Sequence, residues 1–186
     1  MTTDELLARI KSDDEKVRTA AWLEAGKVGA DAMVPLAAVT ADKDLEVARA
    51  AQRAMWQIVR YAGRPGAAGE KKAVVEKLLA LLGDGQPASL RRDVLWMLSE
   101  IGDDQVVAPV AALLGNQELR EDARMALQRI PGEKSLEALK AALAAVPGDF
   151  KINIASSLRA RGVEVPGLPC QKLVPTKKTS VTPVGR

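Results

Sequence analysis

The segments VARAAQRAMWQIV, residues 47–59, and LRRDVLWMLSEIG, residues 90–102, decide the fold of this chain. When the two are aligned without gaps, positions one, five, nine and twelve are apolar in both. Side chains at these offsets lie along one side of an α-helix. Each segment is therefore predicted to form one amphipathic helix with a single buried stripe.

Three further segments of thirteen residues follow the pattern, so the chain is built from repeats. The second position is basic in four of the five windows. Most windows end in Gly or Pro, which stop helices through a left-handed cap or a missing backbone donor. The five windows are 17–29, 47–59, 90–102, 119–131 and 150–162, and they start 30, 43, 29 and 31 residues apart.

A second helical stretch precedes each window, which makes every repeat a helical hairpin. Asp14 and Asp44 stand just before the second helices of the first two repeats, where a carboxylate can accept bonds from unpaired backbone N–H groups. We interpret both as helix caps and not as catalytic acids. The preceding stretches are about 3–10, 31–40, 68–82, 105–114 and 134–145.

Composition agrees with an all-α protein. The chain has 186 residues, of which 47% are hydrophobic and 27% charged, a balance typical of a folded domain. Only three Trp, one Tyr and one Phe are present. Few aromatic residues and abundant Ala and Leu favour closely packed helices over a β-sandwich or barrel.

The repeats resemble HEAT repeats, in the short form of the phycobilisome-lyase-like group. The resemblance covers nearly all of residues 3–162 and implies a right-handed α-solenoid of about five hairpins. HEAT repeats occur in scaffolds, regulators and a few enzymes, so the resemblance implies no catalysis. The segments that carry it are DEKVR (14–18) leading to Val28 and Gly29, MVPL (33–36), VAPV (107–110), and Leu119-Arg120 leading to LQRI (127–130).

We expect two regions, a solenoid over residues 1–162 and an extended tail over 163–186. The tail has four prolines and no helical period. Between the second and third windows, residues 61–69 form an inserted loop, either a tolerated surface insertion or a flap beside the binding face. In the last window Ser157 and Arg161 replace apolar residues, so we expect a polar outer side that ends the solenoid.

The sequence has few of the residues that catalysis or metal binding requires. It contains no His and a single cysteine, Cys170, so a structural zinc site and the common general base are excluded, and no cofactor is implied. We expect a protein that is not an enzyme. A lone cysteine cannot form an internal disulfide, and no leader or membrane-spanning stretch is evident, so we expect a cytoplasmic location.

Binding is predicted on the concave face, which the second helices line in HEAT-like solenoids. Window positions three, six, seven and ten share that face, and every tryptophan of the chain falls on it. Either these tryptophans fill gaps between repeats, or they form with neighbouring arginines a surface for a peptide or protein partner. The predicted partner-binding residues are Trp22, Arg49, Arg53, Trp56, Arg92, Trp96 and Arg124.

A nucleic-acid partner is the alternative. Four arginines on this face could contact phosphates, with tryptophans against bases, as in the alkylpurine DNA glycosylases built on HEAT-like repeats. Against it, residues 1–162 carry 23 basic and 23 acidic side chains, and Trp96 is followed four residues later by Glu100 where the glycosylases have an aspartate. We interpret Arg18, Arg91 and Arg120, at the second window position, as structural.

Overall fold

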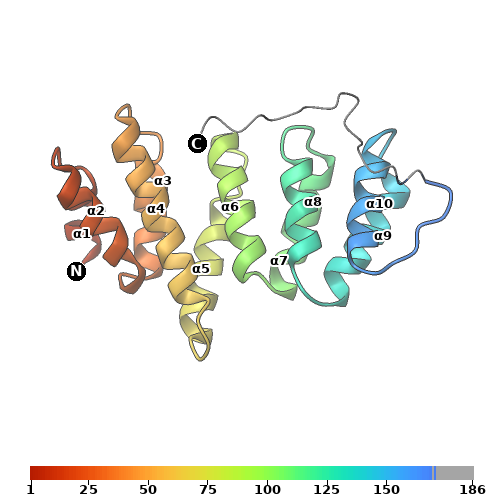
Figure 1. The fold of residues 1–186 in the computed structure, drawn as a ribbon, viewed down its shortest axis with the longest axis horizontal. Coiled ribbons are helices and arrows are strands. Elements are labelled where there is room, and N and C mark those ends of the chain that lie inside the picture. The colour runs from red at the N-terminus through yellow and green to blue at the C-terminus, as the bar shows by residue number, and fades with distance from the viewer. Residues whose placement is uncertain (169, 171–186) are drawn as a thin grey trace, which may run out of the picture.

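The computed structural model describes residues 1–168 and 170, and over these residues it is all-α (Figure 1). No helix in this part of the chain is both long and apolar enough to cross a membrane. Short 3-10 turns cover Ala25–Lys27, Ala30–Ala32 and Leu113–Gly115. The ten α-helices are α1 (Thr3–Ile10), α2 (Glu15–Glu24), α3 (Met33–Val39), α4 (Leu45–Ala62), α5 (Ala68–Ala80), α6 (Ala88–Ile101), α7 (Asp104–Ala112), α8 (Arg120–Arg129), α9 (Glu133–Ala145) and α10 (Phe150–Ala160).

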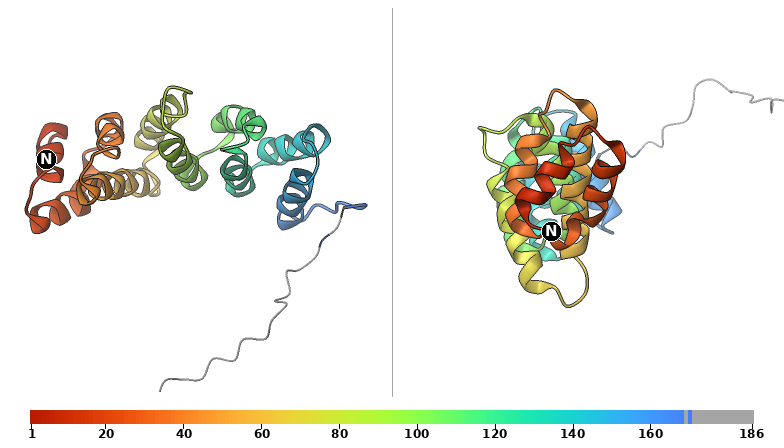
Figure 2. Two further views of the ribbon diagram at one scale, coloured as in Figure 1. Left: turned by 90° about the horizontal axis from the view of Figure 1, so that it is seen from above. Right: turned by 90° about the vertical axis from the view of Figure 1, so that its left-hand side faces the viewer.

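The helices pack as five consecutive pairs, from α1 with α2 to α9 with α10. Second helices form one row, in which α2, α4, α6, α8 and α10 each contact the next (Figure 2). First helices form the other row, where α3, α5, α7 and α9 are in contact in turn. The predicted all-α solenoid of five helical hairpins is confirmed.

The apolar stripe of the second helices lies between the two rows. In α4 the stripe residues Ala51, Met55 and Ile58 are fully buried, and in α6 Val94 and Leu98 are as well. The first helices contribute Leu6, Ile10, Met33 and Leu36 to the same core. Burial of this stripe drives the assembly, because removing apolar surface from water stabilises a fold by about 25 cal/mol per Å².

Both predicted caps are confirmed. The side chain of Asp14 accepts a bond from the backbone N–H of Lys16, at 2.8 Å. The side chain of Asp44 accepts from the N–H groups of Glu46 and Val47. These carboxylates therefore stabilise the N-termini of α2 and α4.

The inserted segment 61–69 is only partly a loop. Helix α4 continues to Ala62, and the turn that follows carries the chain to α5 at the lower tip of the molecule in Figure 1. Arg64 holds this turn: it donates to the carbonyl of Tyr61 and pairs with Glu70 at 2.5 Å. Its side-chain hydrogen bond to Glu70 lowers the pKa of that carboxyl below its ordinary value.

The prediction that Ser157 and Arg161 form a polar outer side is wrong. Ser157 is fully buried, and Arg161 reaches back to the preceding hairpin. The Leu127 carbonyl has no intrahelical donor, because the residue four positions later is Pro131. Arg161 supplies that donor at 3.2 Å and also bonds the carbonyls of Ile130 and Gly132 and the hydroxyl of Ser135. The polar positions thus join the last hairpin to the fourth.

The predicted tail, residues 163–186, lies largely outside the described residues, which end with 163–168 and 170. Within that short part, Arg159 of α10 donates to the carbonyls of Val165 and Leu168. The boundary at residue 162 stays a prediction.

We predict that Arg161→Met lowers the free energy of unfolding by about 2 kcal/mol, because it leaves the Leu127 carbonyl without a donor and removes a charged donor from the carbonyls of Ile130 and Gly132. Urea unfolding followed by circular dichroism measures the change. Lys140→Met, on the exposed face of α9, is the control and is expected to have little effect. Equal stabilities of the two variants would contradict the role of Arg161.

Candidate functional site

The seven predicted partner-binding residues lie on four helices of the second row. We call the surface that they mark the second-helix face. Arg49, Arg53 and Arg92 are exposed, whereas Arg124 and the three tryptophans are half-buried. By helix, the residues are Trp22 on α2, Arg49, Arg53 and Trp56 on α4, Arg92 and Trp96 on α6, and Arg124 on α8.

Trp22 and Trp56 combine the two roles proposed for the tryptophans. Both pack against the hydrophobic core, and both keep part of the side chain in solvent. An arginine lies over each ring: Arg53 above Trp22 and Arg60 above Trp56, each with its guanidinium carbon 5.4 Å from the ring centroid. This distance is within the range of cation–π attraction.

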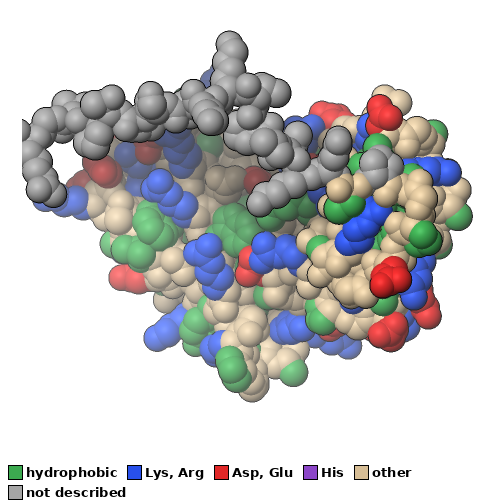
Figure 3. Space-filling model, turned by 45° about the vertical axis from the view of Figure 1, so that its right-hand side comes forward, with side chains coloured by type: hydrophobic (Ala, Val, Ile, Leu, Met, Phe, Trp, Pro, Cys, Tyr) green, Lys and Arg blue, Asp and Glu red, His purple; other side chains and the backbone are tan. Residues whose placement is uncertain are grey.

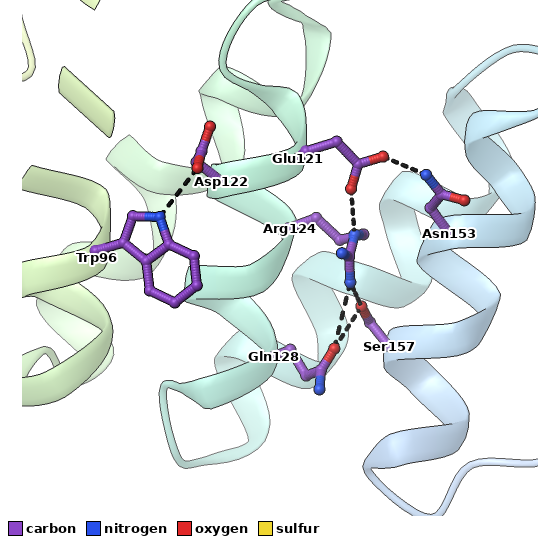
Figure 4. A network of polar contacts seen from close by, with 7 residues as sticks. All are labelled: Trp96, Glu121, Asp122, Arg124, Gln128, Asn153 and Ser157. Atoms are coloured by element: carbon purple, nitrogen blue, oxygen red, sulfur yellow. Dashed lines mark hydrogen bonds and ion pairs between the residues drawn. The ribbon is translucent and has the colours of Figure 1, made fainter. Parts of the chain in front are cut away.

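Trp96 is fixed by a neighbouring helix. Its indole N–H donates to Asp122 of α8 at 3.0 Å, as Figure 4 shows. Arg92, one turn earlier on α6, lies 3.6 Å from the same Asp122 and donates to the carbonyl of Glu118. The ring and the guanidinium of α6 are therefore both engaged with α8.

Arg124 is the centre of the polar network in Figure 4. It pairs with Glu121 at 2.8 Å and donates to Gln128 and to Ser157 of α10. Ser157 in turn donates to Gln128, and Asn153 of α10 donates to Glu121. Only 16% of the Arg124 side chain is exposed, so its bonding groups are used within the protein.

Sequence reasoning missed the residues at window position four. Asp93, Asp122 and Asn153 occupy it in the last three repeats, and each meets the second helix before its own. In the first two repeats the position is Ala20 and Ala50. The change from alanine to Asp or Asn was the available signal, and it marks where polar bonds join successive second helices.

Asp93 is the one carboxyl in this row with a raised pKa. It accepts a hydrogen bond from Gln52 of α4 at 2.5 Å. Burial raises the pKa of Asp93, and the negative charge of Asp122 adds to the rise, while the bond from Gln52 opposes it. A half-buried carboxyl held by one amide is suited to joining α4 and α6.

The basic residues of this side do not form a continuous patch. On the face drawn in Figure 3, outside the grey atoms, blue side chains form separate spots among green and tan ones. Several arginines are paired with acids, including Arg49 with Glu46. Glu100, which the comparison with glycosylases singles out, pairs with Arg129 at 2.6 Å.

The arginines at the second window position have the contacts of structural residues. Arg18 donates to the carbonyl of Ser12 at 2.7 Å. Arg91 is buried and pairs with Asp84 at 2.9 Å. Arg120 lies over the ring of Phe150, 4.7 Å from its centroid.

An apolar cavity of about 460 Å³ lies away from the second-helix face. Alanines of α7 and α9 line it, together with Arg120 and Phe150, and none of the seven predicted residues does. A smaller cleft of about 200 Å³ between the starts of α4 and α6 contains Arg49, Gln52 and Asp93. Of the seven predicted residues, Arg49 is the one that lines a described cavity.

Comparisons with known proteins do not assign a family. No family model matches the chain, and no curated protein does. Among solved structures, one similar chain is a computationally designed armadillo repeat protein for modular peptide recognition, with 18% identity, a TM-score of 0.45, and 83% of this chain and 80% of that chain covered. A second designed armadillo repeat protein is 16% identical over 84% of this chain and 98% of that chain, with a TM-score of 0.37. Neither likeness is close enough to support a functional argument.

Arg124 and Arg49 should differ in their effect on stability. We predict that Arg124→Met lowers the free energy of unfolding by about 2 kcal/mol, because Ser157 and Gln128 lose a charged donor. Arg49→Met should cost less than about 0.5 kcal/mol, since its pair with Glu46 is exposed. Chemical denaturation of both variants tests this, and a similar loss in each would contradict it.

The raised pKa of Asp93 predicts a pH-dependent contribution to stability. Between its ordinary pKa of 3.8 and the higher folded value, the folded state binds more protons than the unfolded state, so stability falls as pH rises. Asp93→Asn keeps an acceptor for Gln52 and removes the charge. The stability of Asp93→Asn relative to the unmodified protein should therefore increase from pH 4 to pH 7.

Denaturation midpoints at several pH values measure this difference. Asp13→Asn, at an exposed position before α2, is the control for the loss of one negative charge. A stability difference for Asp93→Asn that is constant between pH 4 and pH 7 would contradict the prediction.

Proposed function

We propose that this chain is a binding scaffold without catalytic activity, and that its second-helix face takes a peptide or a surface of another protein. The observation that carries the proposal is the placement of all three tryptophans of the chain on one row of helices, each partly exposed. Trp and Arg are the residue types most enriched among the side chains that dominate protein interfaces.

The polar groups of this face support binding more than catalysis. Its carboxylates already serve contacts within the chain: Asp93 with Gln52, Asp122 with Trp96, and Glu121 with Arg124. The sequence has no His to act as general base. In the described part of the chain, no group of three or more acidic or Cys side chains is arranged to hold a metal ion.

We also infer that the repeats are of the short HEAT type and that the protein works in the cytoplasm. Asp caps before the second helices and Pro35 and Pro109 within the first helices support the repeat type. The cytoplasm is supported by the single cysteine, which cannot form a disulfide within the chain.

Tryptophan fluorescence offers a direct test, because every tryptophan lies on the proposed face. We predict that peptides selected from a random displayed library against the intact chain shift its tryptophan emission on binding. Trp56→Ala/Trp96→Ala should weaken these peptides at least about tenfold, the loss expected when a central aromatic contact is removed. Fluorescence titration measures both effects.

The control is Lys72→Ala/Lys140→Ala, which changes exposed residues on α5 and α9 in the first row. Folding of each variant is checked by a thermal melt. If the peptides bind the intact chain and both double variants equally, with no change in tryptophan emission, the binding site lies on another surface. Binding of nucleic acid alone, falling steeply as salt rises, would favour the nucleic-acid alternative.

A further inference from the structure

We propose that the partner segment is acidic and extended, and that it binds the first two hairpins along α4. The inference rests on the proposed function and narrows it to one part of the second-helix face and one class of ligand. The residues that carry it are Arg53 and Arg60, whose guanidinium groups lie over the rings of Trp22 and Trp56.

Arg53 and Arg60 differ from most arginines of the described chain because no carboxylate or carbonyl accepts from them. Among residues 1–168, Arg120 is the one other arginine with an aromatic contact and no acceptor. Arg120 is half-buried over Phe150 beside the apolar cavity. Arg53 and Arg60, by contrast, are both exposed on one helix.

The ring contacts leave the guanidinium groups available to an anion. Cation–π attraction acts between the charge and the ring, and none of the five N–H donors is bonded to a carboxylate or carbonyl of the described chain. These donors match a carboxylate in a bidentate arrangement. The indole ring also holds the guanidinium in place, so less side-chain entropy is lost when the anion binds.

The two arginines lie on one stripe of α4. Arg49, Arg53, Trp56 and Arg60 are spaced four, three and four residues apart, which places them on the same side of the helix. Arg53 and Arg60 are seven residues apart, a rise of about 10.5 Å along the axis. Helix α4 runs toward the lower tip of the molecule in Figure 1.

The spacing suits an extended segment with acids at every third residue. In a polyproline II helix, side chains three residues apart lie on the same side and about 9 Å from each other. Such a segment could place one carboxylate on Arg53 and the next on Arg60. Its intervening residues would meet the exposed part of Trp56.

Charge favours an acidic protein segment over two other possible ligands of the α4 stripe, the chain's own C-terminal segment and a nucleic acid. The chain's own segment 163–186 carries four basic residues and one acid, so it has the same sign as the α4 stripe. A nucleic acid would need a run of phosphate contacts, and two arginines that could supply them, Arg92 of α6 and Arg124 of α8, are paired with Asp122 and Glu121. An acidic protein segment needs only the two unpaired guanidinium groups.

Fluorescein-labelled peptides of the form (Asp-Pro-Pro)4 test the proposal by anisotropy with the full chain. We expect (Asp-Pro-Pro)4 to bind, and (Asn-Pro-Pro)4 and (Lys-Pro-Pro)4 to bind at least about tenfold more weakly. Arg53→Gln and Arg60→Gln should each weaken (Asp-Pro-Pro)4 by about tenfold. Arg129→Gln, an exposed arginine on α8, should leave binding unchanged.

Three results would overturn the proposal: equal binding of the Asp and Asn peptides, equal losses in all three arginine variants, or tighter binding of the oligonucleotide (dT)12 than of (Asp-Pro-Pro)4. The peptides selected from the random library distinguish a failure of the acidic specificity from a failure of the proposed scaffold function. If those peptides still require Trp56 and Trp96 while acidic peptides do not bind, the proposed scaffold function is supported and the proposed preference for an acidic ligand is wrong.

Discussion

The apolar stripe of each second helix is buried between the two rows of helices, and the rest of the structure depends on this packing. The stripe of α4 and α6 includes fully buried Ala51, Met55, Val94 and Leu98. Small residues let neighbouring helices approach closely, and a repeat of this kind cannot bury its apolar face alone. Close approach also brings the side chains beside the stripe within bonding distance of the next helix.

Those flanking side chains divide the second-helix face into two halves. From α4 to α10, polar bonds join successive helices: Gln52 with Asp93, Trp96 with Asp122, and Arg124 with Ser157. Between α2 and α4 the contact is Arg53 over Trp22, with no acid involved. The same packing geometry therefore produces polar side chains that bond to one another from α6 to α10, and exposed cationic groups on α4.

Hairpins, caps and buried stripes were predictable because each depends on local spacing, as the Asp44 cap and the burial of Met55 show. Contacts between repeats were not predictable in the same way. Arg161 occupies a stripe position, which suggested an outer surface, yet its long side chain reaches the Leu127 carbonyl that Pro131 leaves unpaired. Arg124 was predicted to bind a partner, but its neighbours on α10 engage it. Side-chain reach and the offset between hairpins decide such contacts, and a single sequence encodes neither directly.

The two halves of the face also differ in what binding an anion would cost. To meet an external carboxylate, Arg124 must give up its bonds to Glu121, Gln128 and buried Ser157, which leaves polar groups without partners. Arg53 has no such bonds to give up, because its described contact is with the ring of Trp22. An acidic ligand therefore gains net interaction at α4 that it cannot gain at α8. The same side chain thus has a structural role at Arg124 and an unpaired guanidinium group that can bind a ligand at Arg53.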